Sequence, residues 1–129
     1  RAAYPGGGMS DTLATAFATV LRAAAGLPEV EEGLWYGTPS LKVRGKGFCR
    51  LKDADTLVLL CPMEEKELLM EMEPAVFFET DHYKGWPAVL ARLPRIDADR
   101  LRHQLERAWR YKAPKRLVDR YDATRGASD

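Results

Sequence analysis

The feature that most constrains the fold of this chain is a regular alternation of apolar and polar side chains within residues 33–61. Leu41 and Val43 point to one side of an extended segment, and Lys42 and Arg44 point to the other. A period of two is typical of strands with one face on a core and the other in water. The connections between these segments are too short for parallel crossovers. The region therefore predicts four consecutive antiparallel strands, at about 33–37, 40–45, 48–52 and 56–61, with turns at 45–47 and 52–55.

The rest of the chain predicts three helices and two further strands. Apolar residues recur at steps of three and four after Ser10, and similar patterns occupy about residues 63–73 and 97–113. Residues 75–80 and 87–93 are predicted to be strands. The predicted order is α-β-β-β-β-α-β-β-α. This order indicates an α+β fold in two layers, a mostly antiparallel sheet of about six strands with helices on one face.

A length of 129 residues suits one domain. Residues 1–8, "RAAYPGGG", have the character of a remnant of recombinant expression before a start at Met9. We therefore predict a single domain at 9–118 and a flexible C-terminal tail at 119–129. No apolar run approaches the roughly 18 residues of a membrane span, and no secretory signal is recognisable. The expectation is a cytoplasmic protein without a membrane partner.

The two cysteines are predicted to be buried and reduced. If residues 52–55 turn a hairpin, Cys49 faces Val58 and Cys61 faces Lys46. The thiols are then several residues out of register, which is too far for a disulfide. Two small buried thiols are typical of a reducing compartment.

Charge is distributed unevenly, although the net charge is only +1. Residues 41–52 contain five cations and no acid. We call the candidate site here the basic hairpin face; it comprises Lys42, Arg44, Lys46, Phe48, Arg50 and Lys52. Such a face can neutralise phosphates and stack a base on Phe48. It can equally be a solvated strand surface whose cations discourage aggregation.

Apolar residues also occur on the side of the fourth strand where polar ones are expected, at Val58 and Leu60. Either another segment covers them, or they form an exposed apolar strip with Phe48. An exposed strip predicts a protein-interaction or chaperone-like module that binds a partner chain or a second copy.

Aromatic residues gather in two separate segments, which a sheet can bring together. They suggest a cleft that stacks a ring or base, formed by Trp35, Tyr36, His82, Tyr83 and Trp86. The same residues can simply pack core and corner positions. A small-molecule or enzyme site is a third interpretation of this region.

Catalytic and metal chemistry have little support in the sequence. His82 and His103 have no partner at a metal-ligand spacing, so no metal site is expected. No serine or cysteine lies in a nucleophile-elbow context, and "GKG" at 45–47 precedes no helix that could bind phosphate. We therefore expect no catalytic residues and no cofactor.

Three long segments resemble the landmarks of the MmcQ/YjbR family. They are residues 27–51 (LPEVEEGLWYGTPSLKVRGKGFCRL), 74–93 (PAVFFETDHYKGWPAVLARL) and 108–117 (AWRYKAPKRL). Their order and spacing agree with the family from about Leu13 to Leu117. The resemblance implies a helix-flanked antiparallel sheet of the frataxin-like, secretion-chaperone-like or "double wing" type. It also implies DNA binding, a label that rests on likeness of fold.

The sequence thus favours a small non-catalytic binding protein whose ligand is DNA, bound through the basic hairpin face. The alternative is the protein-interaction module, with a protein partner or self-association through Phe48, Val58 and Leu60.

Overall fold

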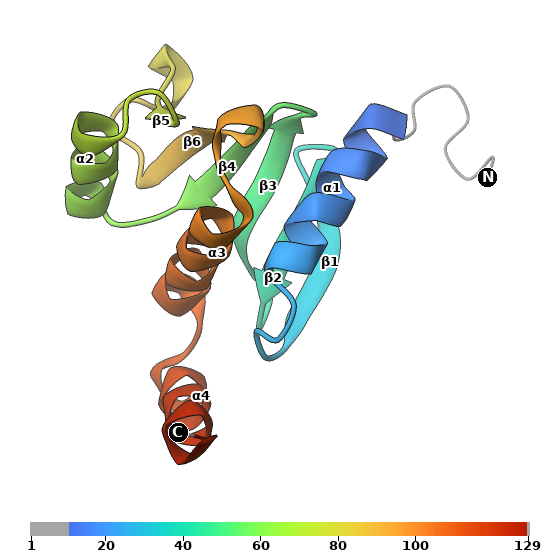
Figure 1. The fold of residues 1–129 in the computed structure, drawn as a ribbon, viewed down its shortest axis with the longest axis vertical. Coiled ribbons are helices and arrows are strands. Elements are labelled where there is room, and N and C mark those ends of the chain that lie inside the picture. The colour runs from blue at the N-terminus through green and yellow to red at the C-terminus, as the bar shows by residue number, and fades with distance from the viewer. Residues whose placement is uncertain (1–10, 129) are drawn as a thin grey trace.

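The computed structural model describes residues 11–128 and contains four α-helices and one six-stranded antiparallel sheet (Figure 1). The predicted expression remnant at 1–8 lies outside the described residues. The helices are α1 (Asp11–Ala23), α2 (Met63–Met72), α3 (Ala98–Lys112) and α4 (Lys115–Ser128). The strands are β1 (Val30–Trp35), β2 (Thr38–Val43), β3 (Lys46–Asp53), β4 (Thr56–Leu60), β5 (Phe77–Phe78) and β6 (Ala88–Arg92). Two 3-10 turns, η1 (Asp81–Tyr83) and η2 (Leu93–Arg95), flank β6. The α+β fold and its predicted element order are confirmed.

Two tight turns make the first three strands a continuous meander. Each turn has two central residues with positive φ, Tyr36 and Gly37 between β1 and β2, and Arg44 and Gly45 between β2 and β3. This is the requirement of a type I′ turn, whose twist matches that of the flanking strands. The second turn therefore lies at 44–45, one residue before the "GKG" turn predicted from the sequence.

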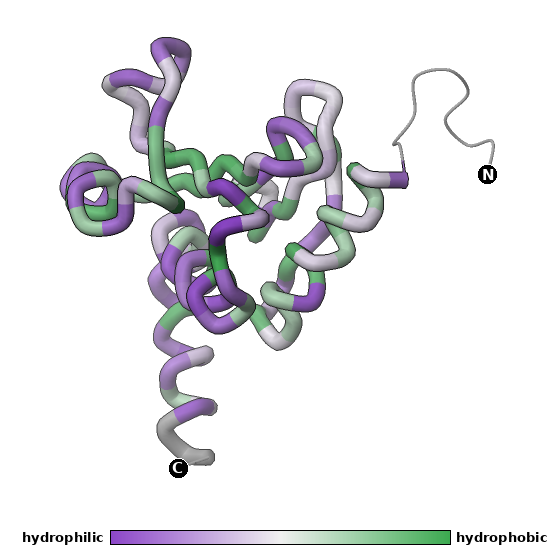
Figure 2. The backbone as a smooth tube through the Cα atoms, turned by 45° about the horizontal axis from the view of Figure 1, so that its top comes forward, coloured by the Kyte–Doolittle hydropathy of each residue, from purple (hydrophilic) through white to green (hydrophobic). Residues whose placement is uncertain are grey.

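The sheet has the order β1-β2-β3-β4-β6-β5, and one face of it carries the main core. Helices α1 and α3 pack against this face and against each other (Figure 1). Leu41, Leu57 and Leu59 are fully buried beneath them, as are Leu105 and Trp109 of α3. The hydropathy colouring shows apolar segments gathered in the middle strands and a largely hydrophilic α4 (Figure 2).

A β-bulge in β3 changes which residues reach the core. Leu41 pairs with Cys49 but Lys42 pairs with Gly47, so Phe48 is the extra residue on its strand. Phe48 and Cys49 are consequently both buried in the main core, and Phe48 is 0% exposed. The predicted exposure of Phe48 is wrong, because a bulge breaks the period-two alternation from which it was inferred.

The hairpin of β3 and β4 is also one residue out of the predicted register. Cys49 faces Leu59, and Arg50 faces Val58. Both cysteines are free and buried, as expected. The pairing of Arg50 with Val58 places a cation beside an apolar side chain on the face opposite the main core.

The C-terminal segment is helical where the sequence predicted a flexible tail. Leu117 of α4 is buried in the main core, and Tyr121 makes an edge-on contact with Trp109 at 5.0 Å between ring centroids. Arg110 of α3 is ion-paired with Asp122 of α4. These contacts hold α4 against the end of α3, although most of α4 extends below the sheet (Figure 1). Among the described helices, none is long and apolar enough to cross a membrane.

Candidate aromatic pocket on the outer face of the sheet

The face of the sheet turned away from α1 and α3 is called the outer face. Residues that pair across neighbouring strands point to the same side of a sheet. The register therefore places five residues on the outer face: Trp35, Lys42, Arg50, Val58 and Leu90. Val58 and Leu90 are direct partners and are both buried. The outer face therefore has its own apolar patch beneath a covering segment.

The covering segment is residues 80–87, which connect β5 to β6. Tyr83 is buried in this segment and packs with Val58, Ala88 and Leu90 in a second, smaller hydrophobic cluster. Leu60 is partly buried against the same cluster. Val58 and Leu60 are thus covered, and Phe48 lies on the opposite face of the sheet. The predicted exposed strip of Phe48, Val58 and Leu60 is not present.

A pocket of about 120 Å³ lies between this segment and the hairpin of β1 and β2, which we call the first hairpin. The five aromatic and histidine residues grouped from the sequence all line it. The complete lining is Trp35, Tyr36, Arg50, Val58, Leu60, His82, Tyr83, Trp86 and Ala88. The floor is apolar, because it is formed by Val58, Leu60 and Ala88. The rim is aromatic, with Tyr36 73% exposed and Trp86 57% exposed.

Arg50 is held at the wall of the pocket by several contacts. Its Nη1 donates hydrogen bonds to Thr38 Oγ1 at 2.9 Å and, at 3.5 Å, to the carbonyl of Leu51. Its Nη2 donates to the hydroxyl of Tyr83 at 2.7 Å. The guanidinium carbon also lies 5.1 Å from the centre of the Tyr36 ring, within cation–π range. Arg50 therefore joins the first hairpin to the covering segment and has a fixed position.

The first hairpin supplies two stacked rings. The ring centroids of Trp35 and Tyr36 are 6.1 Å apart, and the angle between the two ring planes is 14°. The indole of Trp35 rests directly on Gly47, where an added Cβ would lie 2.7 Å from the ring. A glycine is needed at this position because the ring occupies the space of any side chain. Tyr36 has a positive φ because it lies in the turn between β1 and β2, and this turn places the Tyr36 ring at the rim of the pocket.

Lys66 of α2 holds the covering segment in place by hydrogen bonds to its backbone. Its side chain is completely buried, and its ammonium donates to the carbonyls of Tyr83 and Trp86 at 2.6 and 2.9 Å. It is also ion-paired with Glu79 at 2.9 Å. Buried lysines are rare unless they are paired and hydrogen-bonded in this way. Lys66 thereby fixes the two backbone positions that carry the aromatic wall.

Neither Lys66 nor the bridging role of Arg50 was predicted from the sequence. A signal for Lys66 exists: it is the only cation in an acid-rich helix, and it precedes the buried Leu69 by three residues, on the same helix face. The contacts of Arg50 depend on Tyr83, which is distant in sequence. Nothing in the alternation pattern of β3 indicates that partner.

The structure does not bring the six residues of the basic hairpin face together on one surface. Phe48 is in the core, and Lys42 faces Glu31 across β1 and β2. Arg44 lies in the turn and is ion-paired with Glu29. Lys46 and Lys52 are exposed at the two ends of β3, and Arg50 belongs to the pocket.

Glu29 interacts with two cations near the turn between β2 and β3. The hydrogen bond from Arg44 lowers the pKa of Glu29, against the opposing effect of desolvation. Arg120 of α4 approaches the same carboxylate at 3.7 Å. One carboxylate therefore lies between a cation of the hairpin and a cation of α4, which reduces the positive field of the turn.

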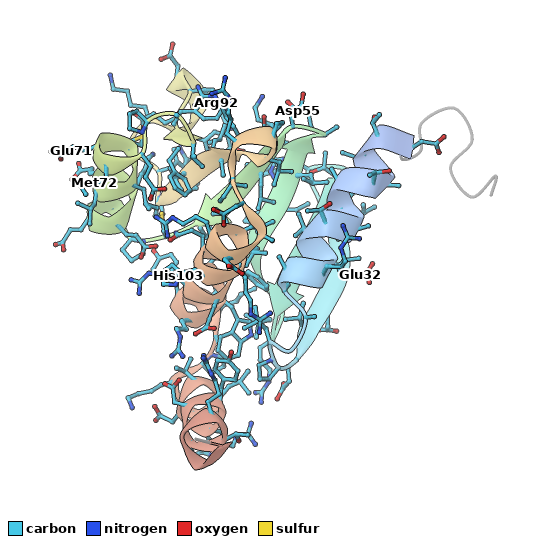
Figure 3. The ribbon with its side chains drawn as sticks, viewed as in Figure 1. Glu32, Asp55, Glu71, Met72, Arg92 and His103 are labelled. Atoms are coloured by element: carbon cyan, nitrogen blue, oxygen red, sulfur yellow. The ribbon has the colours of Figure 1, made fainter. Side chains whose placement is uncertain are left out.

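Other reactive groups lie away from the pocket or are inert. Burial raises the pKa of the Cys49 and Cys61 thiols to about 12, so neither is a thiolate nucleophile at neutral pH. His103 lines a separate groove between α2 and α3 (Figure 3). Among the described residues, no group of three or more His, Cys, Asp or Glu side chains is placed to hold a metal ion.

Comparison with known proteins identifies the family. The sequence model of the YjbR family matches residues 25–111, which include all of the pocket lining and most of the fold. The chain belongs to the YjbR family. The resemblance found in the sequence is therefore confirmed.

Curated relatives of this YjbR-family chain are mycobacterial. It is 43% identical over 61 residues to the uncharacterized protein Mb2600 of Mycobacterium bovis and to the uncharacterized protein Rv2570 of Mycobacterium tuberculosis. Each match covers 47% of this chain and 47% of the relative. The matched part thus spans about half the length of the curated relatives. No solved structure gives a significant match.

Proposed function

We propose that this YjbR-family chain is a non-catalytic, cytoplasmic binding protein for single-stranded nucleic acid, which it holds on the outer face of the sheet. The observation that carries the proposal is the aromatic pocket with its two exposed rings, Tyr36 and Trp86. Single exposed rings are common on protein surfaces, but two that border one apolar pocket are typical of a binding site. Two free cysteine thiols favour a reducing compartment.

Single-stranded nucleic acid fits this surface for two physical reasons. Bases that are not paired expose their faces, and they stack on aromatic side chains of proteins that bind single strands. Exposed lysines of β3 and the covering segment can contact the phosphates, and they are Lys46, Lys52 and Lys84. Aromatic rings that stack bases, combined with cations that contact the backbone, are typical of proteins that bind single strands.

Duplex DNA fits less well. Phosphate contacts provide most of the affinity for a duplex, so a duplex-binding face needs a dense array of free cations. On the basic hairpin face, however, Arg44 is paired with Glu29 and Lys42 lies opposite Glu31. Phe48, the ring expected to contact a base, is buried.

The test is fluorescence anisotropy with a labelled ten-nucleotide single strand and a ten-base-pair duplex, each across a salt series. Two to four phosphate contacts predict a log–log slope of roughly −1.5 to −3 for the single strand. We expect the single strand to bind more tightly than the duplex. Equal or tighter duplex binding, or no binding of either at low salt, contradicts the proposal.

Variants of the rim residues provide the site-specific control. Loss of one stacking ring costs about 1–3 kcal/mol of binding free energy, so Tyr36→Ala and Trp86→Ala should each weaken binding by roughly fivefold or more. Tyr111→Ala removes an exposed ring of α3 that lies outside the pocket and should leave the affinity unchanged. If all three variants bind equally well, the aromatic pocket is not the site.

A further inference from the structure

We propose that the pocket accepts one pyrimidine base through its carbonyl edge, so that the protein prefers thymine- or uracil-rich single strands. This inference rests on the proposed function and names the ligand class of the same site. Three features of the pocket carry it: its volume, the balance of hydrogen-bond donors and acceptors in its wall, and its apolar floor.

The volume suits one six-membered ring. The pocket measures about 120 Å³. A dry cavity of about 150 Å³ holds one benzene molecule, and sites for larger organic ligands measure about 300–1,000 Å³. A pyrimidine ring is close to benzene in size, whereas a purine has a second fused ring. Because the pocket is smaller than the cavity that holds benzene, it encloses only the edge of one six-membered ring, and the fused rings of a purine fit it less well. The sugar and phosphate stay outside the pocket.

The wall of the pocket is rich in hydrogen-bond donors. Arginine has five N–H groups, and Arg50 uses three of them in contacts with Thr38, Leu51 and Tyr83. Two N–H groups of Arg50 are left for a ligand. The hydroxyl of Tyr83 accepts a hydrogen bond from Arg50, which leaves its own proton to donate.

Side-chain acceptors in the lining are fewer than donors: they are a ring nitrogen of His82 and the hydroxyl oxygens of Tyr36 and Tyr83. Of the described residues that line the pocket, none carries a carboxylate or an amide side chain. A ligand that presents acceptors is therefore favoured over one that presents donors. Thymine and uracil have two carbonyl groups, cytosine has one carbonyl and an amino group, and adenine has an amino group and no carbonyl.

The floor provides the contact for the ring itself. Val58 and Ala88 are buried, and Leu60 is partly buried beside them. These side chains form an apolar surface on which an uncharged ring can lie.

The experiment compares ten-nucleotide strands of dT, dC and dA by competition for a labelled dT strand at one salt concentration. We expect the order dT, then dC, then dA, with dT bound about tenfold more tightly than dA, because hydrogen bonds to a charged donor are among the stronger ones. Since dA strands also stack on themselves, the decisive quantity is how this ratio changes in variants.

Two variants address volume and hydrogen bonding separately. Ala88→Leu fills the pocket and leaves Arg50 in place, and Arg50→Gln removes the guanidinium. Each should reduce the dT-to-dA ratio to about twofold or less, while thermal denaturation checks that the variant is folded. Ala123→Leu and Arg95→Gln, at exposed positions of α4 and η2, are the matched controls and should keep the original ratio.

The outcomes separate this inference from the proposed function. Equal binding of dT and dA, with Tyr36→Ala still weakening both, overturns the pyrimidine preference and leaves single-strand binding intact. A dT preference that persists in folded Ala88→Leu and in folded Arg50→Gln also overturns it. If none of the strands binds, both proposals fail together.

Discussion

The basic hairpin face and the aromatic pocket share strand β3, yet they behave oppositely when the chain folds. The cations of the hairpin lie close together in the sequence, and folding disperses them. Arg44 is ion-paired with Glu29, Lys42 lies across the strand pair from Glu31, and Arg50 donates a hydrogen bond to Tyr83. The residues of the pocket come from separate segments, and folding brings them together. Cations that are close in sequence thus need not form one surface when neighbouring strands supply acids, whereas aromatic residues from distant segments can converge on one pocket.

The largest expected effect on stability concerns the support of the pocket. Lys66→Met keeps the length of the side chain and removes the ammonium that binds the carbonyls of Tyr83 and Trp86 and pairs with Glu79. Those carbonyls also accept backbone amides and Glu79 is partly exposed, so the loss is moderate, about 2 kcal/mol of unfolding free energy. Urea denaturation measures it.

The matched control for Lys66→Met is a lysine of β3. Lys52→Met makes the same chemical change at an exposed position of β3 and should alter the unfolding free energy by no more than about 0.5 kcal/mol. An unchanged or increased stability of Lys66→Met would mean that desolvation of the buried ammonium outweighs its contacts. The account of Lys66 as an anchor would then be wrong.

Substitution of two glycines in the hairpin of β2 and β3 should cause a smaller loss of stability, for two different reasons. Gly47→Ala forces the indole of Trp35 away from β3, at a cost of about 1 kcal/mol. Gly45→Ala has free space around its new methyl group but a φ of +81°, which costs about the same. Both variants should therefore lose similar stability, and only Gly47→Ala should change the tryptophan fluorescence and weaken single-strand binding. Equal fluorescence changes in the two would contradict the packing of Trp35 on Gly47.

The smallest effect concerns the charge pairing of the turn. The pKa of Glu29 is lowered chiefly by its hydrogen bond from Arg44. A carboxylate with a lowered folded pKa stabilises the fold above its unfolded pKa, and that contribution is lost as the pH falls through the folded value. NMR titration of the wild type and of Arg44→Ala should show the pKa of Glu29 rising in the variant. An identical pKa in both would mean that Arg44 is free to contact a ligand.

The sequence was sufficient for the order of helices and strands along the chain, and it suggested the aromatic grouping as one of two interpretations, for identifiable reasons. Alternation and short turns determine an antiparallel meander, and the pairing of β4 with β6 brings the segment from His82 to Trp86 over the outer face. Alternation could not reveal the bulge at Phe48, because an extra residue changes the face without changing the pattern. Helix α4 was missed because few of its residues are apolar and its packing depends on Trp109 and Tyr121.

The charges were the least predictable part of the site. Glu29 and Glu31 precede the basic segment in the sequence and appeared unrelated to it. The pairing of β1 with β2 places Glu31 opposite Lys42, and the turn places Arg44 on Glu29. Such pairing is set by register, which composition does not contain.

The most direct test of the central claim is the affinity of two double variants for one labelled dT ten-nucleotide strand at 0.15 M salt. Tyr36→Ala/Trp86→Ala removes the exposed rings of the pocket, and Arg44→Ala/Lys46→Ala removes two cations of the basic hairpin face. The account predicts a loss of about 25-fold or more for the first and less than about fivefold for the second. A larger loss for the hairpin variant than for the pocket variant would contradict it.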